Sequence, residues 1–337
     1  MAVRTAIIGA GGIAYCHADA LHKLGVEITG VFDIFPESAA KLAEACGSRP
    51  ISRIDEILDD IDMVHLCTPP SSRIEYAEIA MAAGKHVVSE KPMAITVEDA
   101  EALVALAEKY NVKLMVGFNH RFREGFRMLQ DAVQSGVLGK TTNVFVYRLG
   151  LLGGSVGAKV DSWRTNPKLA CGMTIESLSH DLDMIFQLNG APASVRADVK
   201  ATIEGVPQFD NNVNAMFGFA DGSTALIHAS WSSHLKYSAR GVVGAKGTAV
   251  LVGTDNFDFT EFRIKTADMP HEQVTLLGDV YKFVGCPSYY NENKHFIECI
   301  ERDVPCLADG KYAIRTLKTA HAMLEASNTG GTVKLVL

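Results

Sequence analysis

A glycine-rich turn between an apolar run and a helix is the feature that most restricts what this chain can fold into. Residues Gly9–Ala14 read Gly-Ala-Gly-Gly-Ile-Ala and directly follow the β-branched run Val3–Ile8. They match the pattern G-x-G-x-x-G/A, whose first glycine makes a tight turn and whose second lets the backbone approach a pyrophosphate. The helix that follows offers unpaired N–H groups and a partial positive charge to phosphates. We expect phosphate contacts at Gly9, Gly11, Gly12 and Ile13; the alternative is a glycine turn without a ligand.

The first 120 residues alternate short β-branched runs with longer stretches of helical periodicity. Strands separated by helices of this length imply crossover connections and a parallel, doubly wound sheet. We therefore expect an NAD-binding Rossmann domain in residues 1–120. The predicted strands are Val3–Ile8, Glu27–Phe32, Met63–Cys67, His86–Ser89 and Lys113–Val116, and the predicted helices are Ala14–Leu24, Glu37–Cys46, Arg73–Ala83 and Val97–Tyr110.

The pattern changes near Arg121, after which strand follows strand. Asp221-Gly222 lies between two β-rich runs, Val213–Phe219 and Ser223–Trp231, as expected for a hairpin turn. We expect residues 121–337 to form a second α/β domain on a mostly antiparallel sheet with few helices. Two final helices, near Asn291–Arg302 and Gly310–Ser327, could pack on either domain.

Composition narrows the class of partner and the compartment. A length of 337 residues points to about two domains, and a net charge of −7 lacks the basic field that non-specific nucleic-acid binding needs. No window reaches the roughly 18 uninterrupted apolar residues of a membrane helix, and the first residues do not resemble a secretory signal. The seven cysteines have irregular spacing without a zinc pattern. We expect a cytoplasmic protein without disulfides, structural metal or membrane segment.

The end of the second predicted strand carries the residue that selects the dinucleotide. Asp33 lies 19 residues after Ala14, where a carboxylate accepts hydrogen bonds from both ribose hydroxyls and repels the extra phosphate of NADP. Ile34 follows it, with no arginine or serine to bind that phosphate. These residues favour NAD over NADP, although a strand-end aspartate that starts a turn is the structural alternative.

Two further strand ends border the expected ligand crevice. Thr68 and Pro69 follow the strand at Met63–Cys67, so the Thr68 hydroxyl could reach the cofactor in a loop that prolines stiffen. Glu90 and Lys91 follow the next strand and precede a proline. A buried lysine beside a cofactor can hold a substrate hydroxyl and relay its proton. A plain turn and a solvated Glu-Lys pair are the alternatives.

A third group of polar residues lies in the second half of the chain. Thr174–Gln187 shows helical periodicity, with Glu176, His180 and Asp183 at i, i+4 and i+7 opposite an apolar stripe. A carboxylate one turn from a histidine can orient the ring and raise its basicity, as a general base for an alcohol requires. The alternative is a solvated polar face or a capping cluster.

Taken in order, these motifs resemble the Gfo/Idh/MocA family of oxidoreductases, which includes inositol dehydrogenases and many sugar dehydrogenases. The resemblance covers nearly the whole chain, and Glu-Lys-Pro is its more specific element. It implies a second domain built on an open sheet whose exposed face supports a homodimer or homotetramer. The motifs concerned are the turn at Gly9–Ala14, Asp33, Thr68-Pro69-Pro70, Glu90-Lys91-Pro92, Trp163-Arg164 and His180-Asp181-Leu182-Asp183.

The resemblance also implies roles for individual residues. Lys91 is expected near the nicotinamide and the reacting oxygen, the bond before Pro92 in the cis form, His180 as the acid/base and Arg164 in contact with the cofactor. Two departures affect the second domain. Glu176 stands where many members carry a shorter aspartate, and the glycine-rich run before this helix is thinner. Asn119, at the domain junction, either contacts the nicotinamide ribose or has only a junction role.

The expected activity is hydride transfer between NAD and a secondary alcohol or ketone of a sugar, polyol or sugar derivative. In this hypothesis His180 accepts the hydroxyl proton, Lys91 stabilises the oxygen, and Glu176 orients His180 or holds a neighbouring hydroxyl. A redox-neutral enzyme with tightly bound NAD is the second possibility. A non-catalytic nucleotide-binding regulator is the third, and Lys91 argues against it. The substrate itself is not predicted.

Overall fold

The computed structural model describes residues 3–151, 166, 168–169, 171–202, 209–254, 258–278 and 284–337. The chain divides into two compact units, one of Met1–Phe122 with Lys282–Ile314 and one of Arg123–Tyr281 with Arg315–Leu337. The chain passes from the first unit to the second after Phe122, close to the domain boundary expected after residue 120. The return of the chain to the first unit differs from the expectation that 121–337 forms one domain. Its cause is helix α8, Pro287–Glu301, which packs on α1, Gly12–Lys23.

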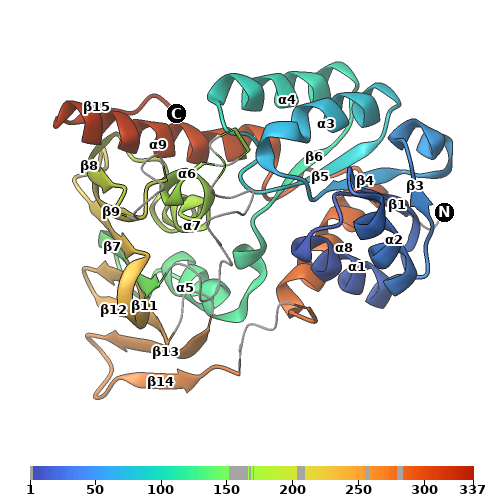
Figure 1. Cartoon of the computed structure of the whole chain (residues 1–337). Helices are drawn as coiled ribbons and strands as arrows, with labels where there is room; N and C mark the ends of the chain where they lie inside the picture. Colours follow the sequence, from blue (N-terminus) through green and yellow to red (C-terminus); the bar gives the residue numbers. More distant parts are fainter. Residues whose placement is uncertain are drawn as a thin grey trace. The chain divides into compact units, whose positions relative to one another are not determined.

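The first unit contains a six-stranded parallel sheet in the order β3-β2-β1-β4-β5-β6 (Figure 1). The inner strand at Met63–Leu66 and the edge strand at Leu114–Gly117 are buried at every residue, as is typical of a parallel sheet covered by helices on both faces. This arrangement confirms the predicted doubly wound Rossmann fold. The strands are β1 Arg4–Ile8, β2 Glu27–Phe32, β3 Pro50–Ile51, β4 Met63–Leu66, β5 His86–Glu90 and β6 Leu114–Gly117.

Helices cover both faces of this sheet. α3 and α4 lie on one face, and α1, α2 and α8 lie on the other (Figure 1). Local chemistry sets their starts: Pro36 occupies the first turn of α2, and the Thr96 hydroxyl accepts the Asp99 N–H at the start of α4. The remaining helices are α2 Pro36–Ala45, α3 Arg73–Ala82 and α4 Val97–Lys109, with short 3₁₀ turns at Ile54–Glu56, Leu58–Asp60, Pro70–Ser72 and Asn119–Phe122.

The second unit is built on a nine-stranded sheet in the order β14-β13-β12-β11-β7-β10-β9-β8-β15. All its pairs are antiparallel except β7 with β10, so the predicted mostly antiparallel sheet is confirmed. The turn at Asp221-Gly222 joins β9 to β10 as predicted, with Gly222 at φ 86°. The strands are β7 Thr141–Leu151, β8 Ser194–Lys200, β9 Asn212–Gly218, β10 Thr224–Ser230, β11 Ser232–Gly244, β12 Gly247–Gly253, β13 Phe259–Thr266, β14 Gln273–Leu276 and β15 Val333–Lys334.

Within the described residues, helices cover one face of this sheet and leave the other open. α5, α6 and α7 pack on β7, β9, β12 and β13, and α9 lies along the same side (Figure 1). Strand alternation places Val146 and Phe217 on the covered face, whereas Tyr147 and Met216 are exposed on the other. The helices are α5 Glu124–Gln134, α6 Met173–Glu176, α7 Ser179–Asn189 and α9 Gly310–Thr329.

None of the seven cysteines forms a disulfide bond in the structure. Across the part of the chain that the structure describes, no helix has both the length and the apolar character needed to span a membrane.

Candidate active site

The glycine-rich turn connects β1 to α1 and has the backbone shape that its sequence demands. Gly9 has φ 95°, and a Cβ there would lie 2.8 Å from the Cys67 carbonyl carbon and the Thr68 nitrogen. Gly11 precedes the first turn of α1, and no atom lies within 4 Å of the Cβ position there. The first glycine is therefore required by the fold itself, whereas the space at Gly11 suits a ligand that approaches the backbone.

Asp33 links the end of β2 to this turn. One carboxylate oxygen accepts the backbone N–H of Ala10 at 2.6 Å, and the other accepts that of Phe35 at 2.8 Å. The two apolar side chains that follow, Ile34 and Phe35, are 70% and 66% exposed. The strand end thus presents a fixed carboxylate beside the glycine turn, next to exposed apolar groups and not to a cation.

The loop after β4 contains a buried hydroxyl and is held by an arginine. The Thr68 Oγ1 is buried. The Thr68 carbonyl accepts from Arg73 Nε at 3.0 Å and from Nη2 at 2.7 Å. Arg73 also donates to the carbonyls of Glu90 and Pro92, so a single buried guanidinium ties the β4 and β5 loops together. Sequence reasoning missed Arg73, although an arginine opening the helix after Thr-Pro-Pro is a usable signal.

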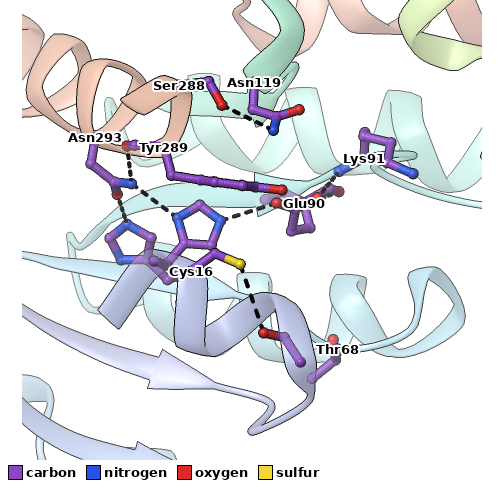
Figure 2. Close-up of polar contacts among 12 residues, drawn as sticks. Cys16, Thr68, Glu90, Lys91, Asn119, Ser288, Tyr289 and Asn293 are labelled. Atoms are coloured by element: carbon purple, nitrogen blue, oxygen red, sulfur yellow. Dashed lines mark hydrogen bonds and ion pairs between the residues drawn. The ribbon is translucent and has the colours of Figure 1, made fainter. Parts of the chain in front are cut away.

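Glu90-Lys91-Pro92 forms the end of β5 and the bend after it. The Lys91–Pro92 bond is cis, as the family resemblance implied. Glu90 is buried, and its second carboxylate oxygen accepts the Lys91 backbone N–H at 3.1 Å. The half-buried Lys91 side chain extends away from that carboxylate (Figure 2). Burial raises the pKa of Glu90, but the His17 hydrogen bond and the nearby Lys91 and Arg73 charges outweigh it and hold this pKa below its usual range.

A buried chain of hydrogen bonds runs to Glu90 from the core of the first unit. His17 Nε2 lies 3.0 Å from Glu90 Oε1, and His17 Nδ1 lies 3.1 Å from Asn293 Nδ2. Asn293 Oδ1 lies 2.6 Å from His65 Nε2, and His65 Nδ1 lies 3.0 Å from Thr5 Oγ1. In Figure 2 dashed contacts of this chain end at the labelled Asn293 and Glu90. No sequence pattern reveals this chain, because its five members come from five separate elements.

One group of possible metal ligands occurs in the described part of the chain. It consists of His17, Glu90 and Glu292, all buried, with ligand atoms within 4.8 Å of one another. The nitrogens of His17 already face Glu90 and Asn293. The hydrogen bonds therefore account for His17 and Glu90 without an ion.

Asn119 lies at the end of the first pass through this unit, in the 3₁₀ turn after β6. It is buried, and its Nδ2 lies 3.4 Å from the Ser288 hydroxyl at the start of α8 (Figure 2). The residue thus joins two segments of the first unit that are 169 positions apart in sequence. Because this contact lies within the first unit, the role at the domain junction and the ribose contact both stay predictions.

In the second unit, the segment predicted as one helix over Thr174–Gln187 is two helices, and this prediction was wrong. α6 ends at Glu176 and α7 begins at Ser179. The Leu178 N–H bonds to the Met173 carbonyl, five residues back, and the Ser179 hydroxyl caps the Glu176 carbonyl. The i, i+4 spacing of Glu176 and His180 therefore does not describe a continuous helix face.

The three ionisable residues of this segment are buried, not solvated. Glu176, His180 and Asp183 are only 4%, 7% and 1% exposed, which excludes the solvated-face alternative. Asp183 accepts the Gln187 amide at 2.7 Å. Burying ionisable groups costs free energy unless they are hydrogen-bonded or paired with a charge, so such groups are retained where they stabilise the fold or act at a site. Arg164 lies outside the described residues.

The start of α6 is fixed by one close approach. The Asp210 carboxylate accepts from the Thr174 N–H at 2.8 Å and from its hydroxyl at 2.6 Å. A Cβ on Gly172 would lie 1.8 Å from Asp210 Oδ1, so only glycine fits there. Burial raises the pKa of Asp210. A single glycine, Gly172, is therefore enough to allow the close approach of Asp210, although this sequence has fewer consecutive glycines here than many family members.

Asp181, next to His180, anchors α7 to the sheet. It accepts from Arg148 Nη1 of β7 at 2.9 Å and from Arg240 Nε of β11 at 2.7 Å, and all three side chains are buried. The Arg148 guanidinium also donates to the Ser177 carbonyl at 2.9 Å. Burial lowers the pKa of Arg240, while Asp181 raises it and the Arg148 and Arg123 charges lower it further. The pair of arginines therefore holds both the turn before α7 and its first residues.

Comparison with known proteins places both units in one family. Residues 3–118 match the family model described as "Oxidoreductase family, NAD-binding Rossmann fold", and residues 126–250 match the Gfo/Idh/MocA C-terminal domain. Inositol 2-dehydrogenase of Rhizobium meliloti (strain 1021) is 30% identical over 334 residues, which cover 97% of each chain.

Two further proteins show the range of this similarity. D-xylose 1-dehydrogenase [NADP(+)] of Haloarcula marismortui is 26% identical over 287 residues, 82% of this chain and 75% of its own. The solved structure of levoglucosan dehydrogenase in complex with NADH superposes with a TM-score of 0.89 over 100% of both chains at 20% identity, which shows the shared fold. The glycine turn, the Glu-Lys-Pro bend and the antiparallel second unit therefore identify the chain as a member of the Gfo/Idh/MocA family of oxidoreductases.

Proposed function

We propose that this oxidoreductase transfers a hydride between NAD and a secondary alcohol or ketone of a sugar, polyol or sugar derivative. The observation that carries the proposal is that several groups able to contact a ligand lie together at the carboxyl edge of the first sheet. The open space at Gly11, the buried Thr68 hydroxyl and the fixed Asp33 carboxylate fit a dinucleotide. When bound, the nicotinamide supplies the hydride acceptor or donor.

The residues favour NAD over NADP. A 2′-phosphate next to Asp33 would meet a carboxylate whose position two backbone N–H groups fix. The exposed neighbours Ile34 and Phe35 offer that phosphate no cation. A carboxylate repels a second anion unless a cation lies between them. NAD, which lacks the 2′-phosphate, is therefore the better match.

We assign two residues to the proton and the charge of the reaction. Lys91 holds the substrate oxygen and stabilises its negative charge, and His180 takes the hydroxyl proton during oxidation. Glu176 orients His180 or holds a neighbouring hydroxyl. The two residues belong to different units, and they are assigned to one reaction on chemical grounds, because alcohol oxidation needs both a base and a cation at the oxygen.

The substrate class follows from the family. The inositol 2-dehydrogenase at 30% identity and the D-xylose 1-dehydrogenase at 26% identity are named for a polyol and for a sugar. We extend that class, but no particular member of it, to this chain. The sequence-based expectation of a cytoplasmic protein and of a homodimer or homotetramer belongs to the same proposal.

A screen of inositols, aldoses and sugar acids with NAD, read by NADH absorbance, tests the function. Lys91→Ala and His180→Ala should each lower turnover by about two orders of magnitude or more while NAD binding survives. Exposed Lys41→Ala serves as a matched control that should keep the wild-type rate. Near wild-type rates in both site variants would remove the assignment. Retained NAD without net NADH formation would instead indicate redox-neutral chemistry.

A further inference from the structure

Asn293 lies between two buried histidines, and its amide orientation is fixed by a third neighbour. Its Nδ2 lies 2.8 Å from the Tyr289 carbonyl oxygen, and the two residues adjoin in Figure 2. A carbonyl oxygen only accepts hydrogen bonds, so the atom that faces it must be the amide nitrogen; the flipped amide would set two oxygens against each other. The amide therefore donates to His17 and accepts from His65.

This orientation determines which nitrogen of each histidine carries the proton. His17 Nδ1 faces the Asn293 donor and must accept, so the His17 proton lies on Nε2 and points at Glu90 Oε1. His65 Nε2 faces the Asn293 oxygen and must donate, so its Nδ1 accepts from the Thr5 hydroxyl. Each member donates to the next, from Thr5 through His65, Asn293 and His17 to Glu90.

We propose that His17 and Asn293 are positioning residues for the Glu-Lys-Pro bend. The chain of donors ends on Glu90, which in turn accepts the Lys91 N–H. His17 and Asn293 are at most 1% exposed, so water cannot replace a lost donor at low cost. The proposal rests on the proposed function, because it takes Lys91 as the group that holds the substrate oxygen.

Other ionisable groups also surround the Glu90 carboxylate, and the variants at His17 leave them in place. Arg73 of α3 donates to the Glu90 carbonyl, and Glu292 of α8 lies within 4.8 Å of Glu90. Cys16 of α1 and Cys67 after β4 also act electrostatically with Glu90. The His17 ring nitrogen Nε2 bonds to the Glu90 carboxylate itself, at 3.0 Å. A change at His17 should therefore act on Glu90 directly.

Nitrogen NMR of the full chain labelled with ¹⁵N-histidine tests the proton positions without any activity assay. His17 and His65, assigned by the signals lost in His17→Gln and His65→Gln, should both show the neutral Nε2–H form at pH 7. Asn293→Asp places an acceptor against His17 Nδ1 and should move the proton to that nitrogen. Asn111→Asp, the same change at a remote exposed site, should leave both rings unaltered. An Nδ1–H form or an imidazolium at His17 in the wild type overturns the proposal.

A second pair of variants tests whether the chain acts on Lys91. His17→Leu removes the donor, whereas His17→Gln keeps an N–H for Glu90. His17→Leu should shift the Lys91 amide resonance and lower kcat about tenfold or more, with the KM for NAD unchanged, and His17→Gln should restore most of both. An unmoved Lys91 resonance in a folded His17→Leu overturns the positioning role. A wild type that oxidises no sugar or polyol would overturn the proposed function, while the resonance still decides the positioning role.

Discussion

The Asp33 carboxylate accepts the backbone N–H of Ala10 at 2.6 Å, which bonds the end of β2 to the glycine-rich turn. Its other oxygen accepts the Phe35 N–H at 2.8 Å. Asp33 therefore has a structural task in addition to the proposed recognition of the ribose. A substitution that tests cofactor choice must keep an oxygen at this position so that the turn is not lost with the charge.

The double variant Asp33→Ser with Ile34→Arg should reverse the preference for NAD. Serine keeps an acceptor oxygen, removes the charge that repels a 2′-phosphate, and the arginine supplies a cation for it. We expect the ratio of kcat/KM for NAD to that for NADP to fall by about 100-fold. Phe35→Ala, at the equally exposed neighbour, is the control and should leave the ratio within a few-fold of wild type. An unchanged ratio in the double variant would refute the assigned role of Asp33.

Two glycines of the same turn should respond differently to alanine. Gly9→Ala places a Cβ 2.8 Å from the backbone at Cys67 at a φ of 95°, so we expect a lower melting temperature and weak NAD binding. Gly11→Ala meets no atom within 4 Å, so the melting temperature should stay close to that of wild type while NAD binding is lost. Calorimetry and fluorescence titration measure the two effects. Wild-type NAD affinity in Gly11→Ala would contradict the placement of the pyrophosphate.

Asp181 should be essential to the stability of the second unit. Asp181→Ala leaves two buried guanidinium groups, those of Arg148 and Arg240, without their shared carboxylate. Breaking a buried ion pair from one side costs about 3–5 kcal/mol, and urea denaturation should show a loss of that order. Asp198→Ala, which removes an exposed partner of Lys200, should cost less than about 1 kcal/mol. Equal losses in both variants would show that the buried network contributes nothing beyond a surface pair.

The parts of this structure that sequence predicts well are those in which the relevant contacts are local. The turn at Gly9–Ala14, Asp33 and the Glu90-Lys91-Pro92 bend each follow a strand directly, so hydrophobic periodicity places them at the carboxyl edge of the sheet. The hairpin at Asp221-Gly222 is likewise set by its own two residues.

The parts that sequence did not predict depend on distant partners. Asn293 contacts His17 across 276 positions and His65 across 228, and periodicity does not reveal which unit α8 joins. The break between α6 and α7 is also hidden, because its residues stay buried and the apolar spacing continues across it. Arg148 was detectable, since it follows Val144 and Val146 on the buried side of an alternating strand and so requires a buried acid.

The buried ring of His65 should make the folded state sensitive to acid. Burial lowers its pKa from the ordinary 6.5 to about 3, so the folded chain keeps the ring neutral while the unfolded chain binds a proton as the pH falls below 6.5. Stability from this group is complete above pH 6.5 and is lost progressively between 6.5 and about 3, by about 1.4 kcal/mol per pH unit.

His65→Gln tests this dependence. As the pH falls from 6.5 to 5, the free energy of unfolding of this variant should decrease less steeply than that of the wild type. The difference in slope should be about 1.4 kcal/mol per pH unit. The carboxylates with lowered pKa values, such as Glu90 and Asp303, titrate below this window. His86→Gln, at a half-buried ring whose pKa burial also lowers, should change the slope less. Parallel curves for wild type and His65→Gln would be inconsistent with a neutral buried ring.

The face of the second sheet on which the described part of the chain places no helix should be the surface to which a second copy of the chain binds. Met216 and Tyr147 are 55% and 37% exposed there, and His228 bonds to Asn214 at 2.6 Å between them. Exposed apolar groups on a flat sheet face are typical of an oligomer interface. Met216→Glu with Tyr147→Glu should therefore convert the oligomer to a monomer in light scattering after gel filtration. Val304→Glu, an exposed apolar site on the first unit, should leave the mass unchanged. An interface centred on apolar side chains cannot bury two new carboxylates without a large cost in free energy. A wild-type monomer, or a double variant that keeps the oligomeric mass, would therefore show that this face is not the interface.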